Sequence, residues 1–185
     1  MKYISSIIKA DYLQRTRSYG FLITLAIAIY AAYSFVPPPT ASYTTLSVVG
    51  FKGVYNSAWV GYVSGMMTTI MVSLYGFFLI NSGIKKDIDT GVGAIVATTS
   101  ITNFEYLLSK FLSNFLVLLS IMGFTFVISI VMFFVRSSGY PFIIANFVLP
   151  YLLFAVPALL TVSALAIVGE VFLGKRNILQ CIATV

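Results

Sequence analysis

The chain holds few of the side chains that perform chemistry. It has five acidic residues, no histidine and a single cysteine, Cys181. One cysteine rules out a disulfide within the chain, and haem or a Cys/His zinc site would lack its usual ligands. An enzyme inside a membrane needs converging acids or nucleophiles, and only Glu170 stands at such a depth. We therefore expect no catalytic residue, no bound metal and no cofactor in this chain.

Two segments approach known ligand-binding motifs and miss their decisive residues. Gly169–Arg176 nearly follows the phosphate-binding pattern G-x-x-x-x-G-K-[ST], but Arg176 replaces the hydroxyl that would hold Mg²⁺. The D-I-D-T-G run at 87–91 begins like a calcium loop, but Thr98 stands where the bidentate glutamate belongs. We interpret both segments as ordinary cytoplasmic chain that binds neither ATP nor calcium by itself.

The composition is that of a membrane protein. Hydrophobic residues make up 59% of the chain and charged residues 9%, whereas soluble domains have about 25% charged residues. The apolar residues form long runs of the kind that cross a bilayer. We expect an all-α, polytopic membrane helix bundle. It would form one transmembrane domain over 1–185, with four complete transmembrane helices at about 19–36, 58–80, 111–135 and 142–168.

The basic residues predict the orientation of these helices. Nine of the 11 fall on one side of the predicted spans and only Lys52 and Arg136 on the other. The nine are Lys2, Lys9, Arg15, Arg17, Lys85, Lys86, Lys110, Lys175 and Arg176. By the positive-inside rule that side is cytoplasmic, so the N-terminus is expected in the cytoplasm. We expect the membrane to be a plasma membrane, the inner membrane of a bacterium. The net charge of +6 fits this orientation better than nucleic-acid binding.

The two ends of the chain carry weaker signals. Residues 1–18 are expected to form a cytoplasmic, interfacial helix in which Asp11 interrupts an apolar stripe. A cleaved signal peptide is the disfavoured alternative, because its apolar core would exceed the roughly 7–15 residues of a typical one. At the other end a new apolar run begins at Asn177. We read it as the start of a fifth helix in a chain truncated at its C-terminus.

The second apolar run has small and hydroxyl residues at intervals of four: Gly61, Gly65, Thr69 and Ser73. On a helix they share one face, along which another backbone can approach closely. That face packs against a helix of the same chain or lines a subunit interface or substrate route. The sequence leaves both interpretations open.

Charge, glycine and hydroxyl residues gather in one loop, 84–110, between the second and third apolar runs. The run that enters the third span reads Tyr106-Leu107-Leu108-Ser109-Lys110-Phe111. The loop residues that carry a pattern are Asp87, Asp89, Thr90, Gly91, Ile95, Ala97, Thr98, Ser100, Ile101 and Glu105. With its acidic, glycine-containing turn, apolar segment and Ala-Thr step before Tyr-Leu-Leu, this stretch resembles the first cytoplasmic loop of ABC-2 type transporter permeases.

The resemblance implies a transmembrane permease subunit, represented here by its N-terminal portion. Export is the expected direction of transport, and the sequence leaves import open. The loop would be a coupling helix that docks into a separate cytoplasmic ABC ATPase subunit, and Val92–Thr98 would form the docking helix. ATP and Mg would be bound by that ATPase partner. A second permease subunit, identical or different, and membrane lipid would complete the partners.

The rival interpretation is a four-span membrane scaffold or accessory protein without an ATPase. It predicts that the 87–105 loop tolerates substitution, whereas the transporter interpretation predicts lost coupling at unchanged membrane insertion. The sequence leaves the substrate undefined.

Overall fold

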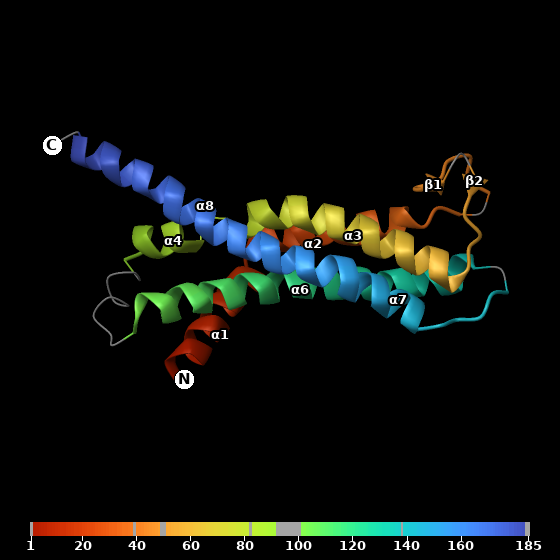
Figure 1. Cartoon of the computed structure of the whole chain (residues 1–185), viewed down its shortest axis with the longest axis horizontal. Helices are drawn as coiled ribbons and strands as arrows, with labels where there is room; N and C mark the ends of the chain where they lie inside the picture. Colours follow the sequence, from red (N-terminus) through yellow and green to blue (C-terminus); the bar gives the residue numbers. More distant parts are fainter. Residues whose placement is uncertain are drawn as a thin grey trace.

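The computed structural model is an elongated helical bundle (Figure 1). It describes residues 2–38, 40–48, 51–81, 83–91, 101–137 and 139–183, of which a few, including those after 171, are described by backbone alone. The helices α2, α3, α6 and α8 run along the long axis, and α1 crosses them at one end (Figure 1). Apart from one small hairpin, the described elements are helices.

The first two helices meet at a sharp corner. Helix α1 covers Lys2–Thr16 and α2 covers Tyr19–Phe35, and the two are bent by 68°. Ser18 makes the corner by taking an extended backbone conformation and accepting a hydrogen bond from the Phe21 N–H through its side chain. This is a typical helix N-cap, and it starts α2 in a new direction. Prolines 37–39 follow the end of α2 and prevent its continuation.

The next elements return the chain across the bundle. Strands β1 (Ser47–Val48) and β2 (Phe51–Lys52) pair antiparallel at the end of the bundle far from α1 (Figure 1). Helix α3 then covers Ser57–Ile80, and its N-cap Asn56 accepts a hydrogen bond from the Trp59 N–H. The short α4 (Gly83–Asp89) follows directly at the opposite end.

Helix α6 (Asn103–Arg136) begins before the third span expected from hydropathy, at Asn103 instead of Phe111. Its start is fixed by a capping box, in which Thr102 accepts from the Glu105 N–H and the Glu105 carboxylate accepts from the Thr102 N–H. The first turns of the helix, including Lys110, are therefore part of the rigid bundle and not of a loop.

The last helical segment is continuous but changes its winding. It consists of α7 (Ala145–Pro150), the π-helical turn η1 (Tyr151–Ala155) and α8 (Val156–Ala183). A wide turn fits here, because Pro157 has no N–H to donate within an α-helical ladder. Helix α8 continues unbroken past Arg176. The segment from Asn177, expected to start a fifth helix, instead extends α8.

Three described helical segments are long and apolar enough to cross a membrane: Ser57–Ile80, Asn103–Arg136 and Ala145–Val171. There are up to four if the bent pair formed by α1 and α2 counts as one span. Side chains such as Val72, Ile121 and Leu159 form the interior of the bundle. Large apolar side chains also cover much of its exterior, as expected for helices in contact with lipid. The length and composition of these helices are those of a multi-pass membrane protein.

Candidate functional site

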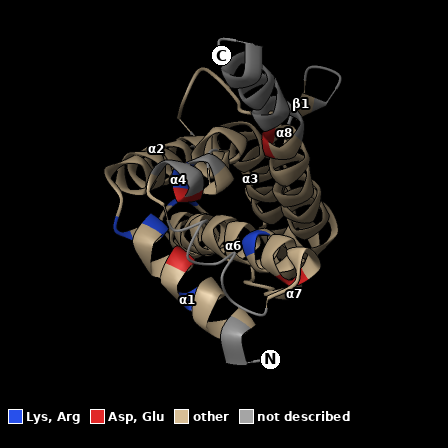
Figure 2. Cartoon of the chain, turned by 90° about the vertical axis from the view of Figure 1, so that its left-hand side faces the viewer, with Lys and Arg blue, Asp and Glu red and all other residues tan. Residues whose placement is uncertain are grey.

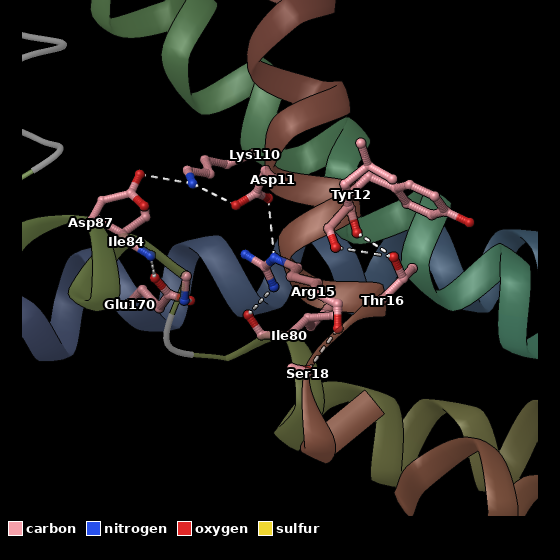
Figure 3. Close-up of polar contacts among 12 residues, drawn as sticks. Asp11, Tyr12, Arg15, Thr16, Ser18, Ile80, Ile84, Asp87, Lys110 and Glu170 are labelled. Atoms are coloured by element: carbon pink, nitrogen blue, oxygen red, sulfur yellow. Dashed lines mark hydrogen bonds and ion pairs between the residues drawn. The ribbon is translucent and has the colours of Figure 1, made fainter. Parts of the chain in front are cut away.

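One lysine joins three elements at the α1 end of the bundle. Lys110, from α6, is 3% exposed and lies between two carboxylates (Figure 3). Its Nζ is 2.9 Å from Oδ1 of Asp11 in α1 and 2.8 Å from Oδ2 of Asp87 in α4. Asp87 also accepts a hydrogen bond of 2.7 Å from the Tyr106 hydroxyl. A buried ammonium is costly unless it is paired in this way, so both carboxylates are needed where they stand.

Arg15 extends the cluster to a fourth element. Its Nε lies 3.1 Å from Oδ2 of Asp11, one turn earlier in α1. Its Nη1 donates a 3.2 Å hydrogen bond to the carbonyl of Ile80, the last residue of α3. A carbonyl at a helix C-terminus has no partner within its helix and carries partial negative charge, so a guanidinium there is favourable.

Glu170 brings α8 to the same place. Its carboxylate accepts hydrogen bonds from the backbone N–H groups of Gly83, at 2.7 Å, and Ile84 (Figure 3). These are the first amides of α4, which lack acceptors within the helix. A carboxylate at that position satisfies both donors and the partial positive charge of the helix end. The position of α4 is thus fixed from α8 at its start and from α6 at Asp87.

The charges of this cluster determine the ionisation of Asp11. Burial by itself would raise the pKa of the Asp11 carboxyl. The positive charges of Arg15 and Lys110 outweigh that effect, and the pKa lies below its usual value of 3.8. Asp11 is therefore a carboxylate at neutral pH, and the ion pairs are formed.

We call Asp11, Arg15, Asp87, Lys110 and Glu170 the charged junction. They join α1, α3, α4, α6 and α8, of which α1, α6 and α8 are distant in the sequence from the neighbouring α3 and α4. Figure 2 looks onto this end of the bundle, where charged residues lie on several neighbouring helices. Helix α4 is followed by Thr90 and Gly91, so the junction fixes the position of the described chain up to that point.

Part of the predicted loop lies in or beside the junction. Asp87 is inside it, and Thr90 is exposed with its hydroxyl donating to the Lys86 carbonyl. Gly91 is exposed with φ of 74°, a left-handed conformation that favours glycine. Ile101 is half-buried next to the capping box of Glu105.

For the other predicted loop residues, the structure describes the backbone alone or nothing. Asp89 ends α4, and its side chain is not among those described. Ile95, Ala97, Thr98 and Ser100, with the expected docking helix, lie outside the described residues.

The predicted small-residue face of α3 lies partly against α7 of the same chain. A Cβ on Gly61 would be 2.3 Å from the carbonyl oxygen of Asn146, and one on Gly65 would be 2.8 Å from Pro150 Cβ. The backbones touch there because glycine leaves room. Thr69 and Ser73 are half-buried further along the helix, and the Thr69 hydroxyl donates to the Gly65 carbonyl.

Sequence reasoning missed the ion pairs of Lys110 and Arg15. Both were counted as cytoplasmic charges, and Lys110 also as part of the run that enters the third span. The capping box at Thr102 was the signal that places Lys110 inside a helix. Nothing in the sequence pairs it with Asp11, 99 positions away. Glu170 caps α4, a contact that the sequence did not indicate.

Among the residues that the structure describes, no group of three or more metal-ligating side chains lies close enough together to hold an ion. Comparison with family models, with curated proteins and with solved structures gave no match.

Proposed function

We propose that this chain is a transmembrane permease subunit of an ABC-2 type transporter. It would move a substrate across the membrane with the energy of ATP hydrolysis in separate ATPase subunits. The observation that carries the proposal is the charged junction, which attaches the start of the 84–110 loop to the helices of the bundle. A loop that receives force from a partner needs such an attachment, because a free connector would move without moving the helices.

The junction supplies the attachment with short, buried contacts. Asp87 is held by Lys110 of α6, and the first amides of α4 are held by Glu170 of α8. A displacement of α4 would therefore pull on α6 and α8, two long helices that run along the bundle. Rigid helices transmit such a displacement along their length, as in other domain and helix shifts.

The proposed topology has four spans and a cytoplasmic N-terminus. Helix α2, Tyr19–Phe35, has 17 residues, which is the lower end of the roughly 17–25 residues that cross a bilayer. Helix α1 would lie in the membrane interface, across the ends of the spans (Figure 1). The junction and its basic residues would face the cytoplasm by the positive-inside rule, in the inner membrane of a bacterium.

The partners are those that the resemblance of the 84–110 loop to ABC-2 type permeases implies. An ABC ATPase with its ATP and Mg would bind the loop, and a second permease subunit would pack beside the first in the membrane. A non-catalytic scaffold is the second candidate, because the same ion pairs would also stiffen the end of a static bundle. The two differ in whether the loop has a partner.

The test is purification of the protein from its native membranes in mild detergent, with mass spectrometry of what co-purifies. The variants Ala97→Glu and Ile101→Glu place a charge in the loop. Phe51→Glu is the matched control, because Phe51 is exposed in the hairpin at the opposite end. We expect a stoichiometric ABC ATPase with the wild type and the control, and its loss with both loop variants. A wild-type protein without an ATPase, or loop variants that keep full ATPase stimulation and transport, would refute the proposal in favour of the scaffold.

A further inference from the structure

A groove opens beside the charged junction, between the α1–α2 corner, the end of α3 and α4. Its volume is about 500 Å³, within the range of roughly 300–1,000 Å³ that small-ligand sites occupy. Its walls differ in character. Arg15, Ser18 and Lys86 line one part, and Ile23, Tyr75 and Phe78 line another.

The polar part favours an anion. Asp11 and Asp87 also line it, but they are held by Lys110 and Arg15, which offset their charge. Lys86 is exposed and, among the described side chains, has no acidic partner within ion-pair distance. Gly20, in the first turn of α2, lines the groove as well. Ser18 accepts the Phe21 N–H of this turn, and the helix N-terminus still carries partial positive charge that adds to the attraction for an anion.

The apolar part faces away from the bundle interior. Ile23 is 61% exposed, Tyr75 51% and Phe78 75%. Ile23 belongs to α2, and Tyr75 and Phe78 belong to the last turns of α3, close to the charged end. Apolar walls that begin beside an anion-attracting pocket match a molecule with a negative head and hydrocarbon chains.

We propose that this groove binds one anionic phospholipid from the adjacent leaflet. The phosphodiester lies against Lys86 and the first turn of α2, and the acyl chains lie along Phe78, Tyr75 and Ile23. Free phosphate would leave the apolar wall empty, whereas a phospholipid covers both parts. Basic residues beside the membrane attract anionic lipids in this way. The inference holds whether the chain is a transporter or a scaffold.

The experiment uses tryptophan fluorescence and brominated lipids, which quench a tryptophan that they touch. The chain has one tryptophan, Trp59, so Trp59→Phe combined with Tyr75→Trp places a single reporter in the groove. The protein is reconstituted in phosphatidylcholine vesicles that contain a small fraction of brominated phosphatidylglycerol or brominated phosphatidylcholine. If the Tyr75→Trp protein cannot be reconstituted, Phe78→Trp takes its place, because Phe78 lines the same apolar wall.

We expect brominated phosphatidylglycerol to quench the reporter at several-fold lower mole fraction than brominated phosphatidylcholine. Lys86→Gln should reduce this preference about fivefold, the contribution of roughly one basic residue at an anionic membrane. Lys9→Gln is the matched control, since Lys9 is an exposed lysine of α1 that does not line the groove. Its preference should equal that of the parent.

Three outcomes would overturn the inference. Equal quenching by the two lipids would show that the groove does not select an anionic head. Equal loss in Lys86→Gln and Lys9→Gln would assign the preference to general surface charge. Relief of the quenching by inorganic phosphate at constant ionic strength would show that the groove takes free phosphate instead of a lipid.

Discussion

Replacing Lys110 with methionine tests the charged junction most directly. Methionine keeps much of the length and the apolar stem of lysine and removes the ammonium. Asp11 and Asp87, which are 7% and 9% exposed, would then lose the cation that they share. Two buried carboxylates would remain near each other with less compensation, and the folded state would be destabilised.

The loss of stability in Lys110→Met depends on the contacts that Asp11 and Asp87 keep. Removing one partner of a buried ion pair costs about 3–5 kcal/mol. Asp11 keeps its contact with Arg15, and Asp87 keeps the Tyr106 hydroxyl. We therefore expect the lower end, a loss of about 3 kcal/mol in the free energy of unfolding. For a chain of this size that corresponds to a decrease in Tm of roughly 6–12 °C.

The assay is thermal unfolding of the purified protein in one detergent, followed by circular dichroism. Lys9→Met is the control, because Lys9 is an exposed lysine of α1 and should change stability by less than about 0.5 kcal/mol. Adding Asp87→Asn to Lys110→Met should restore about 1–3 kcal/mol, because it removes a buried carboxylate that has lost its cation. The reasoning fails if Lys110→Met has the same Tm as Lys9→Met, or if the double variant has no higher Tm than Lys110→Met alone.

Three further predictions concern single features. Glu170→Gln keeps only one acceptor for the first amides of α4, so hydrogen exchange at Gly83 should quicken about tenfold or more; unchanged exchange would contradict the cap. Gly61→Ala places a Cβ 2.3 Å from a backbone oxygen of α7, whereas Gly123 has open space around it. We expect a loss of about 1–3 kcal/mol for Gly61→Ala and none for Gly123→Ala, measured by thermal unfolding. Because the pKa of Asp11 is lowered in the folded state, its ionised form stabilises the protein above its unfolded pKa, and that stabilisation is lost as the pH falls through the folded value. The stability cost of Asp11→Asn should therefore be constant near neutral pH and shrink below pH 3.8; a cost that persists in acid would refute it.

Hydropathy predicted helices long and apolar enough to cross a membrane, because burial in lipid requires long apolar runs whatever the tertiary fold. It was less suited to finding where α6 begins. The residues from Asn103 to Lys110 are mixed in polarity, and the beginning of α6 is determined by the Thr102–Glu105 capping box instead. Local hydrogen bonding and hydropathy are independent signals, and both are needed for a helix that continues beyond the apolar region.

The candidate site was predicted only in part. The loop that contains Asp87 stood out by its composition. Its attachment to the bundle depends on Lys110, Asp11 and Glu170, which are brought together by the packing of α1, α6 and α8. A single sequence does not indicate which charges meet across such distances. The sharp corner at Ser18 turns α1 across the bundle and brings Asp11 to Lys110. The sequence did not indicate this corner either.

The π-helical turn at Tyr151–Ala155 sets the rotational phase between the two ends of its helix. Phe147, Tyr151, Ala155 and Leu159 are all buried, at successive steps of four. In a regular α-helix each such step drifts by about 40° around the axis, and the wider turn absorbs part of this drift. If these five residues were wound as a regular α-helix instead, α8 would be rotated by nearly one residue's step, about 100°, relative to α7. The Glu170 carboxylate would then point away from α4, so a change of winding near one end of the bundle would disrupt the charged junction at the other.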